Sequence, residues 1–122
     1  MKKLNFAATL FGLAIATGAL AQSKSVDLVV TAPTTVRANT TFRVDIKLID
    51  FWTRRPIAGE QVRINWGQEF WLSGSNANTD SLGNASRTIR LGTPGLYRIV
   101  VGFQGSSRWH YMSRTMLFSV VR

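Results

Sequence analysis

Cysteine is absent from the 122-residue chain, and histidine occurs only once, as His110. Without cysteine there is no disulfide, no zinc–thiolate centre and no thiol nucleophile, so a small domain made from this chain relies on its apolar core. One histidine and six acidic residues, none of them closely paired, offer little for acid–base catalysis. Ser106, Ser107 and Ser113 lie near His110, but no nucleophile-elbow motif contains them. The sequence therefore predicts no catalytic residues and a protein that is not an enzyme.

Long apolar runs are also missing, except at the N terminus. Two lysines open the chain, which is then largely apolar up to the small-residue pattern Ala19-Leu20-Ala21. A short cationic start, an apolar centre and small residues before a cleavage point are the parts of a secretory signal peptide. The run is rich in Ala, Gly and Thr and is short for the alternative, a retained membrane anchor of roughly 20 strongly apolar residues. We expect a signal peptide at residues 1–21 and one exported domain at residues 22–122, periplasmic, surface-bound or extracellular.

Acidic side chains are few compared with basic ones. Fifteen Lys and Arg residues stand against six Asp and Glu residues, a net charge of +9, and removal of Lys2 and Lys3 would leave +7. Such an excess favours anionic surfaces, which around a bacterial cell are lipid headgroups, lipopolysaccharide or teichoic polymers. Nucleic acid is a poor match for an exported protein. A basic surface that only keeps the domain soluble is an equally good interpretation, and the sequence leaves the two open.

Apolar residues recur at every second position after Ala21, without a sustained helical period. The clearest segment is 41–48, in which Phe42, Val44, Ile46 and Leu48 alternate with polar residues. The polar stretch 73–80 is rich in turn formers and is expected to be a loop. The expected strands are residues 26–30, 41–48, 61–66, 68–72, 85–91, 96–103 and 115–121. About seven short strands with turn signals between them predict an all-β protein, an antiparallel sandwich.

Three stretches carry a resemblance to a known family. Leu48-Ile49-Asp50 is followed by Pro56-Ile57-Ala58-Gly59 and Val62, residues 79–85 read T-D-S-L-G-N-A, and Gly95-Leu96-Tyr97 begins a strand. In this order and spacing they resemble bacterial immunoglobulin-like domains, the modules of invasin-type adhesins and other cell-surface proteins. The resemblance implies an immunoglobulin-like β-sandwich and a binding or structural role without catalysis.

Three residues are expected to have structural roles in such a domain. Gly83 stands where a tight turn needs a positive φ. Tyr97, after a Pro-Gly turn, is placed like a tyrosine corner whose hydroxyl returns to nearby backbone. Trp66 is placed like the core tryptophan of immunoglobulin sandwiches, and we expect it to be buried.

The binding residues are expected in two loops that emerge at the same end of an immunoglobulin-like sandwich. Residues 51–55 and 108–111 combine tryptophan and arginine, the residue types that most often anchor interfaces. The alternative is that the two tryptophans fold back and plug the end of the core. The predicted site comprises Trp52, Arg54, Arg55, Arg108, Trp109 and His110. Its expected partner is a protein or an anionic cell-envelope polymer, and a membrane surface is among the anionic partners that the charge admits.

A second surface follows from strand parity. If Tyr97 and Ile99 point inward, then Leu96, Arg98 and Val100 face outward, with Leu117 and Val121 beside them. Such an apolar face suits the alternative function, a structural subunit that assembles by sheet-face or edge pairing. A one-residue bulge would reverse this parity.

Residues 76–80 resemble the first part of a calcium-binding loop. Asn76, Asn78 and Asp80 have the spacing, but Ser81 and Arg87 stand where such a loop needs Gly and Glu. We therefore favour a turn here and expect no metal and no cofactor.

Overall fold

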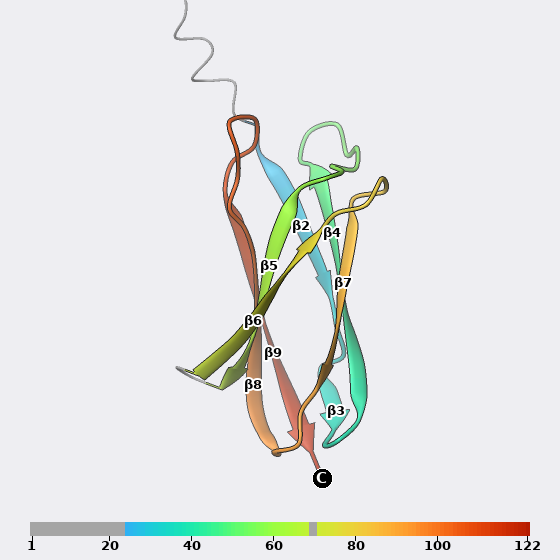
Figure 1. Cartoon of the computed structure of the whole chain (residues 1–122), viewed down its shortest axis with the longest axis vertical. Coiled ribbons are helices and arrows are strands. Elements are labelled where there is room, and N and C mark those ends of the chain that lie inside the picture. Colours follow the sequence, from blue (N-terminus) through green and yellow to red (C-terminus); the bar gives the residue numbers. More distant parts are fainter. Residues whose placement is uncertain (1–23, 69–70) are drawn as a thin grey trace, which may run out of the picture.

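Eight strands form two sheets that face each other in the computed structural model of this chain, which describes residues 24–68 and 71–122 (Figure 1). The expected signal peptide, residues 1–21, lies outside the described residues. Among the described residues no helix is long and apolar enough to cross a membrane. The strands are β2 (Val26–Thr31), β3 (Thr35–Arg37), β4 (Thr41–Asp50), β5 (Gln61–Gln68), β6 (Trp71–Asn78), β7 (Asn84–Arg90), β8 (Gly95–Phe103) and β9 (Met112–Val121).

One sheet has three strands in the order β2-β4-β7, and the other has five in the order β3-β9-β8-β5-β6. All neighbours pair antiparallel except β3, which runs parallel to the end of β9. The prediction of an all-β sandwich is confirmed, but the strand count is eight and not seven.

The core lies between the sheets and follows the period-two pattern. In β4 the side chains of Phe42, Val44, Ile46 and Leu48 are buried, while the polar residues between them are exposed. The buried apolar residues of the two sheets form one continuous cluster. In β8 the buried residues are Tyr97, Ile99, Val101 and Phe103, so the predicted parity is correct for this strand.

Two elements differ from the prediction. The strand β3 has only three residues, too few to show alternation, and is held by its parallel pairing with β9. Residues 73–78, expected to be a loop, belong to β6, which pairs with β5 over eight positions from Gln61–Asn78 to Gln68–Trp71. Ser, Gly and Asn have low strand propensity, but pairing along a neighbouring strand overrides that preference.

Trp66 is less buried than predicted. It lies opposite Ile99 in the β5–β8 ladder and packs against the core cluster, yet it remains only partly buried. Trp66 lies near the end of β5, where the β5–β6 hairpin points away from the three-stranded sheet (Figure 1), so that sheet covers it only in part. The prediction of a fully buried Trp66 is therefore wrong.

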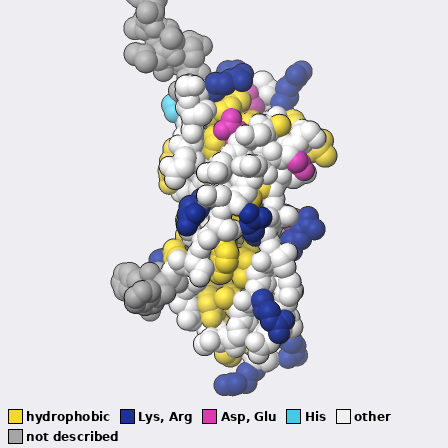
Figure 2. All heavy atoms as spheres, in the orientation of Figure 1, with side chains coloured by type: hydrophobic (Ala, Val, Ile, Leu, Met, Phe, Trp, Pro, Cys, Tyr) yellow, Lys and Arg dark blue, Asp and Glu magenta, His cyan; other side chains and the backbone are white. Residues whose placement is uncertain are grey.

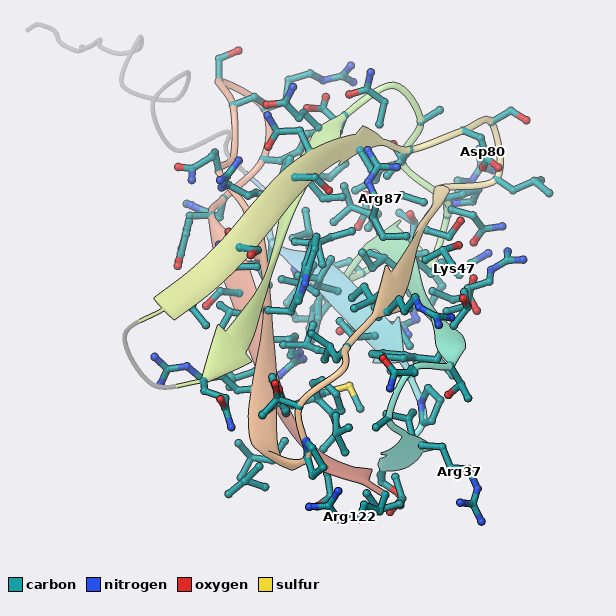
Figure 3. The ribbon with its side chains drawn as sticks, turned by 60° about the horizontal axis from the view of Figure 1, so that its bottom comes forward. Arg37, Lys47, Asp80, Arg87 and Arg122 are labelled. Atoms are coloured by element: carbon teal, nitrogen blue, oxygen red, sulfur yellow. The ribbon has the colours of Figure 1, made fainter. Side chains whose placement is uncertain are left out.

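An arginine spans the space between the two sheets on each side of the sandwich. On one side Arg87 of β7 donates from Nε to Ser75 Oγ (2.7 Å) and from Nη2 to the carbonyl oxygen of Asn76, both in β6 (Figure 3). On the other side Arg114 of β9 donates from Nε to the carbonyl oxygen of Leu28 in β2 (3.2 Å). Each arginine thus occupies backbone or side-chain acceptors at a sheet edge that would otherwise face solvent.

Candidate functional site

The candidate site lies at the end of the sandwich that carries the β4–β5, β6–β7 and β8–β9 connections, called the loop end below (Figure 1). The β4–β5 connection folds around Asp50, whose side chain is buried. Its Oδ1 accepts hydrogen bonds from the backbone N–H groups of Thr53 (3.1 Å) and Trp52 (2.9 Å). The hydrogen bond from Thr53 is the main cause that lowers the pKa of Asp50, with desolvation acting in the opposite direction. The ionised Asp50 therefore fixes the backbone of residues 51–53.

The β6–β7 turn is built in the same way around Asp80. Its Oδ1 accepts hydrogen bonds from the backbone N–H groups of Asn84 (2.9 Å) and Leu82 (2.8 Å), and the pKa of Asp80 is lowered, mainly by the bond from Asn84. Gly83 has the positive φ that the turn needs, 76°. A Cβ on Gly83 would lie 2.6 Å from the carbonyl oxygen of Leu48, so the position also has no room for a side chain.

Two further contacts tie the β6–β7 turn to the β4–β5 connection. The N–H of Leu48 donates to the carbonyl oxygen of Gly83 (2.9 Å), and the N–H of Ile57 donates to the carbonyl oxygen of Leu48 (3.0 Å). Thr79 is buried, and its Oγ1 accepts from the N–H of Glu60 (3.0 Å). The residues that carry the family resemblance in these two stretches thus form one hydrogen-bonded framework.

The β8–β9 connection is joined to the start of the described chain. The N–H of Lys24 donates to the carbonyl oxygen of Arg108, and the N–H of His110 donates to that of Lys24, each over 2.8 Å. Trp109 lies between, partly buried and packed against the core cluster. The Lys24 Nζ atom is 5.8 Å and the Arg108 guanidinium carbon 5.9 Å from the centroid of the Trp109 ring. Trp109 therefore holds two cations near its faces while it closes the end of the core.

An open hollow of about 540 Å³ lies between these loops. Its lining includes three cations, Lys24, Arg55 and Arg108, which form no ion pair with any described residue. It also includes two acids, but Asp50 is already satisfied by backbone N–H groups, which leaves Glu60 as the acid free of such bonds. The lining consists of Lys24, Asp50, Thr53, Arg55, Pro56, Ile57, Ala58, Glu60, Arg108 and Trp109. Its polarity and charge suit an anionic group.

The structure brings three of the six predicted binding residues, Arg55, Arg108 and Trp109, to this hollow. The other three are outside its lining. Trp52 is 75% exposed, and its ring meets that of Phe51 edge-on at 5.1 Å. Arg54 is directed to Asp27 of β2, with Nη2 3.2 Å from Oδ2, and His110 is exposed. The two tryptophans thus differ: Trp109 plugs the core, whereas Trp52 projects from it.

Lys24, Asp50 and Glu60 are the charged lining residues absent from the predicted site, and of these Asp50 had been named only for the family resemblance. Glu60 directly precedes β5, and its closeness in sequence to the predicted loop at residues 51–55 is the feature that could have indicated it as a site residue. Lys24 reaches the site only through its isolated bridge to Trp109, far away along the chain. No local pattern in the sequence indicates that bridge.

The charges are not evenly distributed between the two ends. The acidic side chains visible in Figure 2 lie in its upper half, which holds the loop end, whereas basic side chains are spread over the whole face. Arg37 and Arg122 lie together at the opposite end, where Arg37 Nη1 donates to the carbonyl oxygen of Arg122 (2.9 Å) (Figure 3). The opposite end is therefore also basic, and it supplies matched positions for testing the loop end.

The second predicted surface is present on the outer face of β8 and β9. Leu96 is 62% and Leu117 is 61% exposed, and they line a shallow hollow of about 170 Å³ together with Gly67, Tyr97 and Arg98. Val121 is exposed as well, whereas Val100 is half-buried.

The calcium-like segment forms a strand and a turn. Asn76 and Asn78 belong to β6 and pair with Arg63 and Gln61 of β5, while the Oδ1 of Asp80 is occupied by backbone N–H groups. Within residues 24–68 and 71–122, no three His, Asp or Glu side chains are grouped so that they could hold a metal ion.

No protein-family profile and no curated protein matches the sequence, but solved structures match the fold. A Salmonella α2-macroglobulin superposes with a TM-score of 0.64 at 11% identity, over 82% of this chain and only 10% of that chain. The CARDB domain of the PF1109 protein from Pyrococcus furiosus matches with a TM-score of 0.52 at 12% identity, over 82% of this chain and 90% of that chain. The PKD domain of an M14-like peptidase from a Thermoplasmatales archaeon matches with a TM-score of 0.52 at 16% identity, over 81% and 96%.

CARDB and PKD domains are non-catalytic, immunoglobulin-like β-sandwich modules, so this chain has the fold of such modules. A superoxide reductase from Ignicoccus hospitalis also matches, with a TM-score of 0.56 at 12% identity, over 76% of this chain and 79% of that chain. The fold is thus shared by non-catalytic modules and an enzyme, and function has to be argued from the side chains. The chain is an immunoglobulin-like β-sandwich with a polar, cation-lined hollow between its loops.

Proposed function

We propose that this protein is an exported, non-catalytic interaction module of the bacterial immunoglobulin-like type, whose loop end binds an anionic component of the cell envelope. The observation that carries the proposal is the hollow in which Lys24, Arg55 and Arg108 have no ion-pair partner among the described residues. Cations held close together repel one another, and an anionic ligand relieves that repulsion. An acidic protein is the alternative partner at the same site.

The arrangement separates binding cations from structural ones. Arg54 and Arg114 share Asp27, with Nη2 atoms 3.2 and 3.3 Å from its two carboxylate oxygens, so each has an ion-pair partner and one of their two charges is balanced. Arg55 and Arg108 line the hollow and form no ion pair with a described residue, although Asp50 and Glu60 lie in the same lining. A ligand carrying phosphate, sulfate or carboxylate groups can therefore be bound by two guanidinium groups and the Lys24 ammonium.

The test is a titration with a soluble polyanion, dextran sulfate, with neutral dextran as the negative control. We expect binding of dextran sulfate to weaken steeply between 0.05 and 0.5 M salt, since the Debye length falls below about 10 Å in this range. The double variant Arg55→Gln with Arg108→Gln should lose at least about tenfold in affinity, at roughly 1 kcal/mol for each charge-assisted contact.

The matched control is the pair Arg37→Gln with Arg90→Gln. Arg37 lies at the opposite end, and Arg90 pairs with Thr41 at the start of β4, on the same side as Arg37. This variant has the same net charge as the site variant, so general electrostatic attraction is equal in the two. Equal losses in the two double variants would show that the charge acts through the whole surface, and the proposed site would then be wrong.

A second function is favoured by the exposed Leu96 and Leu117, which suit a structural subunit that assembles through this face. Sedimentation equilibrium at increasing concentration tests it. A dimer or larger assembly that is lost in the variant Leu96→Ser with Leu117→Ser would support assembly, whereas a monomer at all concentrations would exclude it.

A further inference from the structure

We propose that the anionic partner is a lipid bilayer surface, on which the loop end docks with Phe51 and Trp52 in the headgroup interface and with Lys24, Arg55 and Arg108 at the phosphates. This inference rests on the proposed function, because it names the partner of the same end of the molecule. It goes further by assigning a role to exposed apolar side chains that the hollow does not use.

The first supporting observation is where large apolar side chains are exposed. Phe51 (45%) and Trp52 (75%) lie in the β4–β5 connection, Leu82 (61%) lies in the β6–β7 turn, and Tyr111 (62%) precedes β9. All three connections are at the loop end (Figure 1). Four of the eight large apolar side chains that are exposed among the described residues are therefore on loops at this one end, which makes the loop end a candidate interaction surface.

The second observation is the contact that Trp52 makes. Its ring meets the edge of Phe51 and is otherwise directed away from the core, although its backbone N–H is fixed by Asp50. A rigid backbone with a projecting aromatic pair costs little entropy when the pair inserts. Tryptophan and tyrosine are the side chains most enriched where membranes meet water.

The third observation is the charge around these tips. Lys24, Arg55 and Arg108 are unpaired among the described residues, and each basic residue near an anionic bilayer contributes about 1 kcal/mol of attraction. Of the nearby acids, Asp27 is paired with Arg54 and Arg114, Asp50 and Asp80 accept backbone N–H groups, and Glu60 is the acid of the hollow without such bonds. An apolar tip with cations beside it is the combination that holds a protein in the interface.

The experiment measures partitioning of the protein onto vesicles of phosphatidylglycerol and phosphatidylcholine. The protein is purified as the cell exports it, and its N-terminal residue is determined from the mass of the intact chain. We expect Trp52→Ala to reduce the partition coefficient about tenfold, because most of a large aromatic surface leaves water on insertion. Arg55→Gln and Arg108→Gln should each reduce it about fivefold. Leu117→Ala and Arg90→Gln, equally exposed positions outside the loop end, should change it less than twofold.

Depth of insertion gives an independent readout. Lipids brominated near the headgroup should quench the tryptophan fluorescence of the wild type. The variant Trp52→Phe should still bind but lose most of the quenching, which assigns it to this side chain among the four tryptophans.

Three outcomes would overturn the inference. Vesicle binding that is unchanged in Trp52→Ala, or unquenched by brominated lipids, would mean that no side chain inserts. Binding of dextran sulfate but not of vesicles would reject the membrane and leave the proposed anion site standing. Binding of neither would reject the inference and the proposed function together.

Discussion

The β6–β7 turn and the tip of the β4–β5 connection lie at the same end of the sandwich but use their residues in opposite ways. In the turn, Asp80 accepts two backbone hydrogen bonds and Gly83 packs against Leu48 with no room for a side chain. In the tip, Asp50 fixes the backbone in the same manner, but Trp52 is 75% exposed with a ring contact to its neighbour Phe51, and Arg55 forms no ion pair with a described residue. The residues of the turn stabilise the framework, whereas the tip combines a fixed backbone with side chains that are exposed to solvent.

The difference explains why the family resemblance does not include the cations and exposed aromatic residues of the candidate site. The resembling positions Asp50, Thr79 and Gly83 all belong to the framework that joins the two connections. The hollow shares part of its lining with the resembling stretches, from Asp50 and from residues 56–58, but its cations and the exposed aromatic residues stand at other positions, such as Arg108 and Trp52. A shared framework therefore predicts the scaffold of the loops, and the side chains mounted on it decide what is bound.

The largest expected effect is at Gly83. Gly83→Ala should reduce the free energy of unfolding by about 2–5 kcal/mol, because it adds the cost of a positive φ to a clash with the Leu48 carbonyl oxygen. Gly59→Ala is the matched control: Gly59 has a φ of 73°, but nothing lies within 4 Å of its added Cβ, so about 1–2 kcal/mol is expected. Urea unfolding of both variants measures the difference. Equal losses would show that the close packing of Gly83 is not important.

The next effect concerns the buried hydroxyl of the framework. Thr79→Val keeps the side-chain volume but leaves the N–H of Glu60 without its acceptor, so we expect a loss of about 1–3 kcal/mol. Thr88→Val, on the exposed face of β7, should stay within about 0.5 kcal/mol of the wild type. If Thr79→Val is as stable as Thr88→Val, the two connections do not depend on this bond.

Much of the fold could be predicted because burial on one face leaves a period of two in the sequence. The strands at Phe42–Leu48 and Tyr97–Phe103 show this pattern directly, and the tyrosine corner follows from the position of Tyr97 after its turn, with its hydroxyl 2.6 Å from the carbonyl oxygen of Thr93. The strand β3 and the larger part of β6, residues 73–78, could not be predicted. The first is too short for a period, and the second is held by pairing along β5 rather than by its own residues.

The sequence predicts at which end of the sandwich the candidate site lies, but not which residues line it. The topology places the two predicted loops at one end, which is where Arg55, Arg108 and Trp109 meet. The direction of each side chain depends on three-dimensional partners, and Asp27 takes Arg54 away from the hollow. Lys24 enters through a bridge between segments far apart in the sequence. Neither fact leaves a local signal.

The two framework carboxylates should give the protein an acid-sensitive stability. The pKa values of Asp50 and Asp80 are lowered in the folded state, chiefly by the N–H groups of Thr53 and Asn84. A lowered folded pKa gives stability that is present above the unfolded pKa of about 3.9 and is lost as pH falls through the folded pKa. The melting temperature should therefore drop below about pH 4. The variant Asp50→Asn with Asp80→Asn, which keeps acceptor oxygens but cannot titrate, should show a smaller drop between pH 4 and pH 2, and an identical drop would locate the sensitivity elsewhere.

The smallest effect on stability is expected where the functional proposal depends most, at Trp52. Because this side chain is 75% exposed and its ring contact is with Phe51, Trp52→Ala should change the free energy of unfolding by less than about 0.5 kcal/mol. Trp109→Ala is the natural comparison: its ring packs on the core and carries two cations, so about 1–3 kcal/mol should be lost. Urea unfolding of the two variants, followed by far-UV circular dichroism, makes the comparison independent of tryptophan fluorescence. A loss above 1 kcal/mol in Trp52→Ala would place Trp52 in the framework with Asp50 and Gly83, and a projecting side chain at the loop end would then have to be sought at Leu82 or Tyr111.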